Sequence, residues 1–198
     1  DYNLTLNDNT VAPGLSLTVD GSGLSATSEL ILNGAAETNG QLVLTGGAGD
    51  DTLTGGARTD TITGGLGADK ITGGGGSDII VYNATAESTG LNYDTVDGFF
   101  FSRDQFDLAT AVTGVDAAVT TGALSAATFN ADLATALDAL HLGQSHAVLF
   151  TANSGSLAGH TFLVVDQNGI AGYQANLDLV VELTHVDHAN SISTASFI

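Results

Sequence analysis

The chain lacks several residue types that would otherwise suggest a function. It has no cysteine, which excludes disulfide bonds, zinc–thiolate sites and thiol catalysis. It has only three basic residues against 22 acidic ones, so no basic cluster is available for nucleic acid or an anionic membrane surface. No apolar run approaches the roughly 20 residues that span a bilayer. We therefore expect neither nucleic-acid binding nor membrane insertion.

What the chain does contain is apolar residues, glycine and aspartate. Hydrophobic residues make up 43% of the 198 positions, which is too many for an acidic disordered chain. This length suits one domain or two small ones. The acids are 18 aspartates and only four glutamates. Short carboxylates favour turns and oxygen-rich metal loops, so this bias is a first indication of cation binding.

Four nonamers follow one another in constant register from Gly46: GGAGDDTLT, GGARTDTIT, GGLGADKIT and GGGGSDIIV. Twelve of the 26 glycines lie between positions 46 and 76. The sixth place of each nonamer is aspartate, and the eighth is a branched aliphatic residue: Leu53, Ile62, Ile71 and Ile80. A flexible linker has no reason to space aliphatic residues nine apart, so the pattern predicts a folded repeat.

The residue types suggest how such a repeat would fold. Each aliphatic residue sits at the centre of a three-residue strand and points inward. Glycine allows the remaining six residues to form a tight turn, so two nonamers make one coil. The aspartates of successive coils would repel one another, and such thin strands bury little apolar area. A divalent cation with oxygen ligands, such as Ca²⁺, would supply the missing stabilisation.

The GGxGxDxUx pattern resembles the calcium-binding nonapeptide repeat of RTX proteins. The resemblance implies a parallel β-roll with several Ca²⁺ ions, each held between turns of successive coils. It implies one ligand set of Gly47, Gly49, Asp51, Gly64, Leu66 and Asp69. On the opposite flank it implies Gly56, Arg58, Asp60, Gly73, Gly75 and Asp78. Arg58 stands where glycine is usual, and the left-handed conformation often needed there costs other residues on the order of 1 kcal/mol.

Segments on both sides of the nonamers extend the roll. Residues 1–45 carry alternating apolar runs at 15–19, 29–32 and 41–44, which predict an irregular β-solenoid that caps the open end. Downstream, residues 94–108 resemble the segment that closes RTX rolls. This resemblance implies a last Ca²⁺ ion bound by Gly74, Gly76, Asp78, Asp97 and Asp104. Four aromatic residues are expected to plug this end: Phe99, Phe100, Phe101 and Phe106.

Residues 109–198 are expected to form a C-terminal cap. Apolar spacing predicts a helix over 125–142, ended by Gly143, and strands are expected at 147–152, 161–166 and 179–184. The pattern resembles the C-terminal modules of S-layer proteins and large surface RTX proteins exported by type I secretion. The predicted fold is therefore all-β dominated: a parallel β-roll over 46–108, a solenoid lead-in and a β-rich cap with one helix.

No catalytic motif is recognisable. The five histidines form no HExxH pair, and neither a nucleophile elbow nor a phosphate-binding loop is present. Asp166, Asn168, Gly169 and Asp178 fit either a further Ca²⁺ loop or a simple turn.

We expect a non-catalytic, Ca²⁺-binding C-terminal domain of a bacterial surface protein of the S-layer or adhesin type. The expected location is extracellular, at the cell surface, with the type I secretion machinery as a partner. Self-association in a surface layer or a cell-surface glycan would supply further contacts. The alternative is the accessory domain of a secreted metalloprotease, lipase or alginate epimerase, and a catalytic motif in upstream sequence would distinguish the two.

Overall fold

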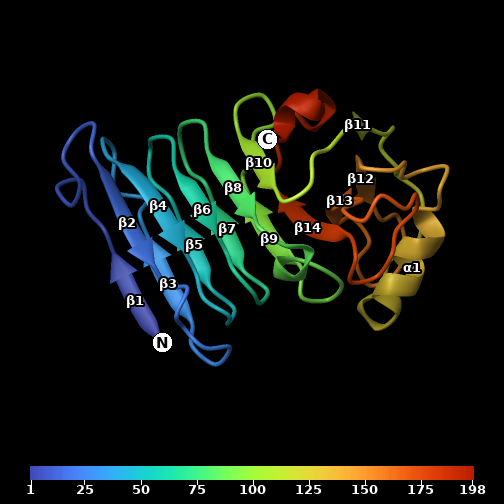
Figure 1. The fold of residues 1–198 in the computed structure, drawn as a ribbon, viewed down its shortest axis with the longest axis horizontal. Helices are drawn as coiled ribbons and strands as arrows, with labels where there is room; N and C mark the ends of the chain where they lie inside the picture. Colours follow the sequence, from blue (N-terminus) through green and yellow to red (C-terminus); the bar gives the residue numbers. More distant parts are fainter.

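A computed structural model describes all 198 residues, and its strands form two sheets (Figure 1). The nine-stranded sheet has the order β1-β3-β5-β7-β9-β14-β13-β12-β11, and the five-stranded sheet has the order β10-β8-β6-β4-β2. The strands of the roll are β1 Tyr2–Thr5, β2 Ser16–Asp20, β3 Leu30–Asn33, β4 Gln41–Thr45, β5 Thr52–Thr54, β6 Thr61–Thr63, β7 Lys70–Thr72, β8 Ile79–Tyr82, β9 Asp94–Asp97 and β10 Gln105–Leu108. Those of the C-terminal part are β11 Gly114–Val115, β12 His146–Thr151, β13 Thr161–Val165 and β14 Leu179–Thr184. Odd and even strands of the roll thus alternate between two parallel sheets, so the expected parallel β-roll is confirmed.

Each nonamer supplies one strand and one turn, with a coil repeat of 18 residues. Leu53 lies opposite Ile71 in one sheet, and Ile62 lies opposite Ile80 in the other. All four side chains point inward and are at most 1% exposed, whereas the flanking threonines lie at the surface. The aliphatic position of the repeat therefore builds the core, and turns stack along both flanks.

Residues 1–45 continue the same two sheets with longer loops. β2, β3 and β4 begin or end within one residue of the expected runs, and β1, which was not expected, pairs with β3. β1 is exposed along its whole length. The strands of the lead-in are therefore regular, and only its turns are irregular.

The C-terminal part extends one sheet of the roll. β14 pairs in parallel with β9, and β13 and β12 follow in antiparallel order. One core runs through the roll into this extension, while a second core lies between β12–β14 and the single helix α1, Phe129–Ala136 (Figure 1). No helix is long and apolar enough to cross a bilayer.

The helix is shorter than the apolar spacing predicts. Phe129, Leu133 and Leu137 are buried as expected, but Leu140 is 90% exposed and α1 ends at Ala136. Asp138 explains the early end, because its carboxylate accepts the backbone N–H of Leu140 and forms a local turn. The expectation that Gly143 ends the helix was wrong.

Aromatic side chains fill the end of the roll. Phe99, Phe101 and Phe106 are buried, and Phe197 from the end of the chain packs against Phe106 with ring centroids 6.2 Å apart. Phe100 differs from the expectation, since it lies partly exposed beneath the guanidinium of Arg103.

Candidate metal centre

The nonamer turns stack in two rows, one on each flank of the roll. Turn 46–51 lies beside turn 64–69, joined by the hydrogen bond from Leu66 N–H to Gly47 O at 3.0 Å. Turn 55–60 lies beside turn 73–78, joined in the same way by Gly75 N–H and Gly56 O at 2.9 Å. The structure therefore pairs the turns that the repeat pattern pairs.

Aspartates at the sixth position connect each turn to the preceding one. Asp69 Oδ1 accepts the backbone N–H of Asp51 at 2.7 Å, and Asp78 Oδ1 accepts that of Asp60 at 2.9 Å. The second oxygens of Asp69 and Asp78 are buried and have no hydrogen-bond partner. Buried polar atoms are rarely left unpaired, so these oxygens need a ligand.

Oxygen atoms converge between turns 46–51 and 64–69. A Cβ atom placed on Gly46 would collide with both Gly64 O and Asp51 Oδ2, so these two oxygens point to one place. A Cβ atom on Gly65 would collide with Gly47 O, and Gly65 adopts φ +105°. Glycine is required here for both space and conformation. Backbone carbonyls and aspartate oxygens close together are the donor set that Ca²⁺ prefers.

The opposite flank repeats this arrangement. A Cβ atom on Gly55 would collide with Gly73 O and lie 2.6 Å from Asp60 Oδ2. Arg58 is not in the left-handed region, so the expected backbone cost at this position does not arise. The positive φ values fall one turn later, at Gly74 and Gly76. Arginine is therefore compatible with the turn that it occupies.

The closing site is not assembled as the resemblance implies. Asp104 takes its place in the row of aspartates, since its Oδ1 accepts Asp78 N–H at 3.1 Å. Asp97 lies on the outer face of β9, where its Oδ1 accepts hydrogen bonds from the Thr184 hydroxyl and the His185 ring, both at 2.6 Å. Successive side chains of a strand point to opposite faces, and Asp97 directly follows the inward-facing Val96, so Asp97 points outward.

Asp94 is the residue that the sequence reasoning missed. Its Oδ1 accepts the backbone N–H of Asp69 at 2.9 Å, and its Oδ2 is buried without a partner. The spacing of 25 residues from Asp69 hides it from a search for 18-residue periodicity. The local signal was present, since Asp94-Thr95-Val96 repeats the Asp-x-aliphatic order of the nonamers.

Burial perturbs the acids of both rows. It raises the pKa of Asp69 and of Asp78 to about 7 and that of Asp94 to about 9, against partial compensation by backbone hydrogen bonds. Neighbouring carboxylates add to the increase, Asp51 acting on Asp69 and Asp69 acting on Asp94. A cation bound between the turns would reverse these shifts, so the residues present fit Ca²⁺.

The family model of the RTX calcium-binding nonapeptide repeat matches residues 45–80 in four copies. Residues 45–80 are RTX repeats. Such repeats bind several Ca²⁺ ions in tandem, so the RTX roll is a calcium-binding unit. No curated protein matches the chain significantly.

Bound Ca²⁺ would supply the positive charge that the RTX roll lacks. Its ligands in each flank site would be the carbonyls and two aspartates of the sets given above, and their assignment to individual ions stays a prediction. No group of three or more His, Asp or Glu side chains is arranged to hold a metal ion. This is compatible with RTX sites, because most of their oxygens come from the backbone.

The Asp166 loop has the geometry of a simple turn. Asp166 Oδ1 accepts the N–H groups of Asn168 and Gly169, and Oδ2 accepts that of Ser145. Asp178 accepts from Gln174 N–H at 2.6 Å and from the Asn168 side-chain amide at 3.0 Å. Each of the four carboxylate oxygens thus accepts a hydrogen bond within the protein.

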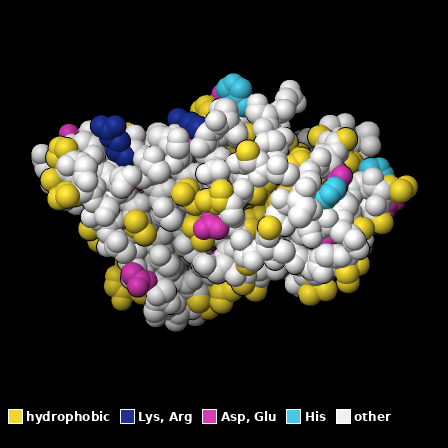
Figure 2. Space-filling view, turned by 45° about the horizontal axis from the view of Figure 1, so that its top comes forward, with side chains coloured by type: hydrophobic (Ala, Val, Ile, Leu, Met, Phe, Trp, Pro, Cys, Tyr) yellow, Lys and Arg dark blue, Asp and Glu magenta, His cyan; other side chains and the backbone are white.

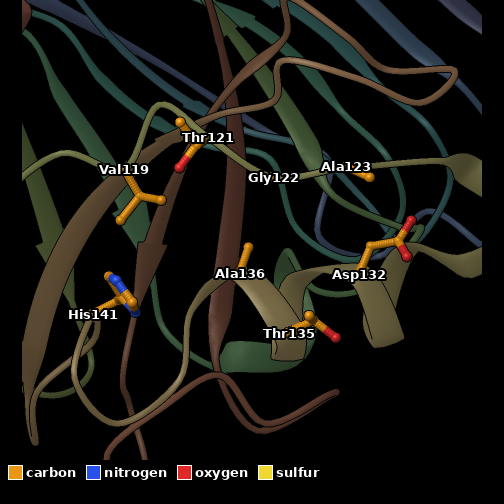
Figure 3. A pocket seen from close by; sticks show the side chains of 8 residues that line it. All are labelled: Val119, Thr121, Gly122, Ala123, Asp132, Thr135, Ala136 and His141. Atoms are coloured by element: carbon orange, nitrogen blue, oxygen red, sulfur yellow. The ribbon is translucent and has the colours of Figure 1, made fainter.

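The histidines of the C-terminal part are also paired. All five histidines place Nδ1 against a carboxylate, in the pairs His141–Asp138, His146–Asp116, His160–Glu182, His185–Asp97 and His188–Asp187. A hollow of about 340 Å³ lies beside α1. Figure 3 shows Asp132 and His141 at its opposite sides. Asp132 accepts from Ser125 N–H and the Thr128 hydroxyl. The expectation that the chain is not an enzyme stays a prediction.

Proposed function

We propose that the chain is a non-catalytic, Ca²⁺-binding C-terminal domain of a secreted bacterial surface protein, of the S-layer or adhesin type. It would fold when it binds Ca²⁺ after type I secretion. The calcium-binding part rests on the RTX repeats. Secretion, the role at the cell surface and the partners are our proposal beyond calcium binding.

The observation that carries the proposal is the burial of many acidic side chains, of which only Asp104 and Glu182 have a basic partner, Arg103 and His160. Ten of the 22 acids are buried: Glu37, Asp51, Asp60, Asp69, Asp78, Asp94, Asp104, Asp166, Asp178 and Glu182. Arg103 is the one Lys or Arg that forms an ion pair. Few acidic side chains are visible on the face in Figure 2, although the formal net charge is −19. Buried carboxylates ordinarily need a paired charge or a metal.

This distribution favours folding outside the cell. Where Ca²⁺ is scarce, the aspartates of the two flanks oppose assembly of the turns, and the chain stays unfolded enough to pass through an export channel. Where Ca²⁺ is plentiful, the ion binds the folded roll and not the unfolded chain, so it drives folding by mass action. The roll thus converts a calcium difference across the envelope into a difference in folding.

The C-terminal part supports the surface role. Residues 109–198 resemble the modules of type I-secreted surface proteins, and they extend the sheet of the roll by β14, β13, β12 and β11. We propose that this part carries the export information. Self-association or a cell-surface glycan would then be the contact that it makes outside.

Export of deletion variants tests the proposal in a host with the matching exporter. The deletion of residues 110–198 should leave the protein in the cells. The deletion of residues 46–81 removes the nonamers, and it should still permit release of a poorly folded, protease-sensitive product. The measurement is the fraction of each variant in the medium or on the cell surface. If the chain without residues 110–198 were exported as well as the intact chain, the secretion proposal would fail.

A further inference from the structure

The turn that closes one flank of the roll, residues 98–104, contains its own positive charge. This turn joins β9 to β10 and lies next to turn 73–78, since Asp78 N–H donates to Asp104 Oδ1 at 3.1 Å. It is the place where the resemblance implied a last Ca²⁺ ion. Arg103 lies here, one residue before Asp104.

The Arg103 side chain contacts the oxygens expected to bind that ion. One terminal nitrogen donates to Gly74 O at 3.0 Å, and Nε lies 3.3 Å from Asp104 Oδ1 as an ion pair. The guanidinium carbon is 4.1 Å from the centre of the Phe100 ring, so the group is held by stacking as well. The guanidinium is thus held by one hydrogen bond, by stacking on Phe100 and by an ion pair with Asp104 in which Nε makes no hydrogen bond.

The equivalent oxygen in the preceding turn has a different partner. Gly56 is 18 residues before Gly74, and Gly56 O accepts the backbone N–H of Gly75. Gly74 O instead accepts from the Arg103 side chain. Asp104 Oδ2 accepts Phe100 N–H at 2.9 Å, and Oδ1, which accepts Asp78 N–H, also lies beside Arg103.

Arg103 is the one basic side chain that forms an ion pair in this place, and its partner is Asp104. Asp78 and Asp104 are at most 3% exposed, and no other basic side chain forms an ion pair with either. The other flank ends without such a cation, at Asp94, whose Oδ2 has no partner. One row of aspartates therefore ends at a carboxylate paired with arginine, and the other row ends at a carboxylate oxygen without a partner.

We propose that the Arg103 guanidinium is a fixed cation that replaces the last Ca²⁺ ion of this flank. The end of the RTX roll that meets the C-terminal part then holds no exchangeable ion between turns 73–78 and 98–104. It closes without Ca²⁺, and the calcium requirement falls on the nonamer turns.

Counting bound ions tests this assignment. Native mass spectrometry of the full chain at saturating Ca²⁺ gives the number of ions per chain. In Arg103→Gln, Gly74 O and Asp104 lose their cation, so this variant should bind one ion more than the wild type. Arg103→Lys keeps the positive charge and should retain the wild-type number.

Lys70→Gln is the matched control, because Lys70 lies in β7 outside every proposed ligand set, is exposed and forms no ion pair. Its ion count should equal that of the wild type. The same count in Arg103→Gln as in the wild type would overturn the proposal.

A calcium-replete crystal structure of the wild type gives a second measurement that does not depend on any variant. It should show the guanidinium, and no ion, between Gly74 O and Asp104. An ion peak at that position would equally overturn the proposal.

Discussion

At the residue scale, the two oxygens of Asp69 and of Asp78 have separate tasks, whereas both oxygens of Asp51 accept backbone hydrogen bonds, from Leu30 and Gly47. In Asp69 one oxygen is occupied by the backbone N–H of Asp51, and the other is buried without a partner. The first contact fixes the distance between turns, and the second oxygen remains for a cation. A longer glutamate side chain would have to fold back to do the same, which accounts for the excess of aspartate over glutamate.

Replacement of Asp69 should raise the Ca²⁺ concentration that folding requires. In Asp69→Asn, the amide oxygen of the new side chain could still accept the Asp51 N–H, but the charged oxygen would be lost. We expect the midpoint of a calcium titration followed by circular dichroism to rise at least about tenfold, which corresponds to about 1.4 kcal/mol. Asp187→Asn is the control, since Asp187 is about half-exposed and outside every proposed site. Equal midpoints for the two variants would contradict the ligand assignment.

Residue-level prediction from the sequence succeeded where the spacing was regular. The sixth-position aspartates came together in rows, as the nonamers indicated. At the closing segment, the resemblance implies Asp97, whereas the structure places Asp94 in the row of aspartates. Only the inward or outward direction of each side chain distinguishes them, and that depends on the register of β9 with β7.

At the element scale, the turns and not the strands define the roll. β5, β6 and β7 have three residues each and bury one side chain apiece. The six-residue turns between them bring oxygen atoms of neighbouring coils so close that glycine is the one residue that fits. The cost of ordering these glycines is then offset by the ion that the turns enclose.

Gly65→Ala should therefore damage the roll without removing any ligand. The added methyl group would collide with Gly47 O, and alanine would have to adopt φ +105°. We expect a loss of about 1–3 kcal/mol in the free energy of unfolding, measured by urea denaturation in Ca²⁺. Gly23→Ala provides a control, because nothing lies within 4 Å of its Cβ position and its φ is not positive. A loss of the same size in both variants would show that the turn geometry is not decisive.

Local sequence signals predicted the strands of the C-terminal part but not how these strands pair. β12, β13 and β14 were expected within one residue of their observed bounds, but the sequence did not predict that β14 pairs with β9. This pairing joins residues 87 positions apart, such as Thr95 and Glu182, and no repeat in the sequence predicts it. The predicted helix is longer than α1, because apolar residues continue at helical spacing past the turn that Asp138 forms.

At the scale of the whole molecule, buried aspartates link folding to both Ca²⁺ and pH. Burial raises the pKa of Asp69 and Asp78 from an ordinary value of 3.8 to about 7 in the folded chain. The folded state without Ca²⁺ thus holds protons that the unfolded chain releases. The stability that these protons provide is fully present below pH 3.8 and is lost as the pH rises through about 7.

Ca²⁺ should reverse this dependence, because the ion binds the ionised carboxylates and competes with protons for them. In EDTA we expect the roll to be more stable near pH 5 than near pH 8, and in millimolar Ca²⁺ we expect the opposite order. At pH 8 in EDTA, circular dichroism should show a largely unfolded roll that gains β signal on addition of Ca²⁺. The measurement is the urea midpoint of the full chain at both pH values, with and without Ca²⁺. If the stability in EDTA rose with pH, or if Ca²⁺ left the midpoints unchanged, the aspartate rows would not be the calcium switch, and the buried carboxylates would need another partner.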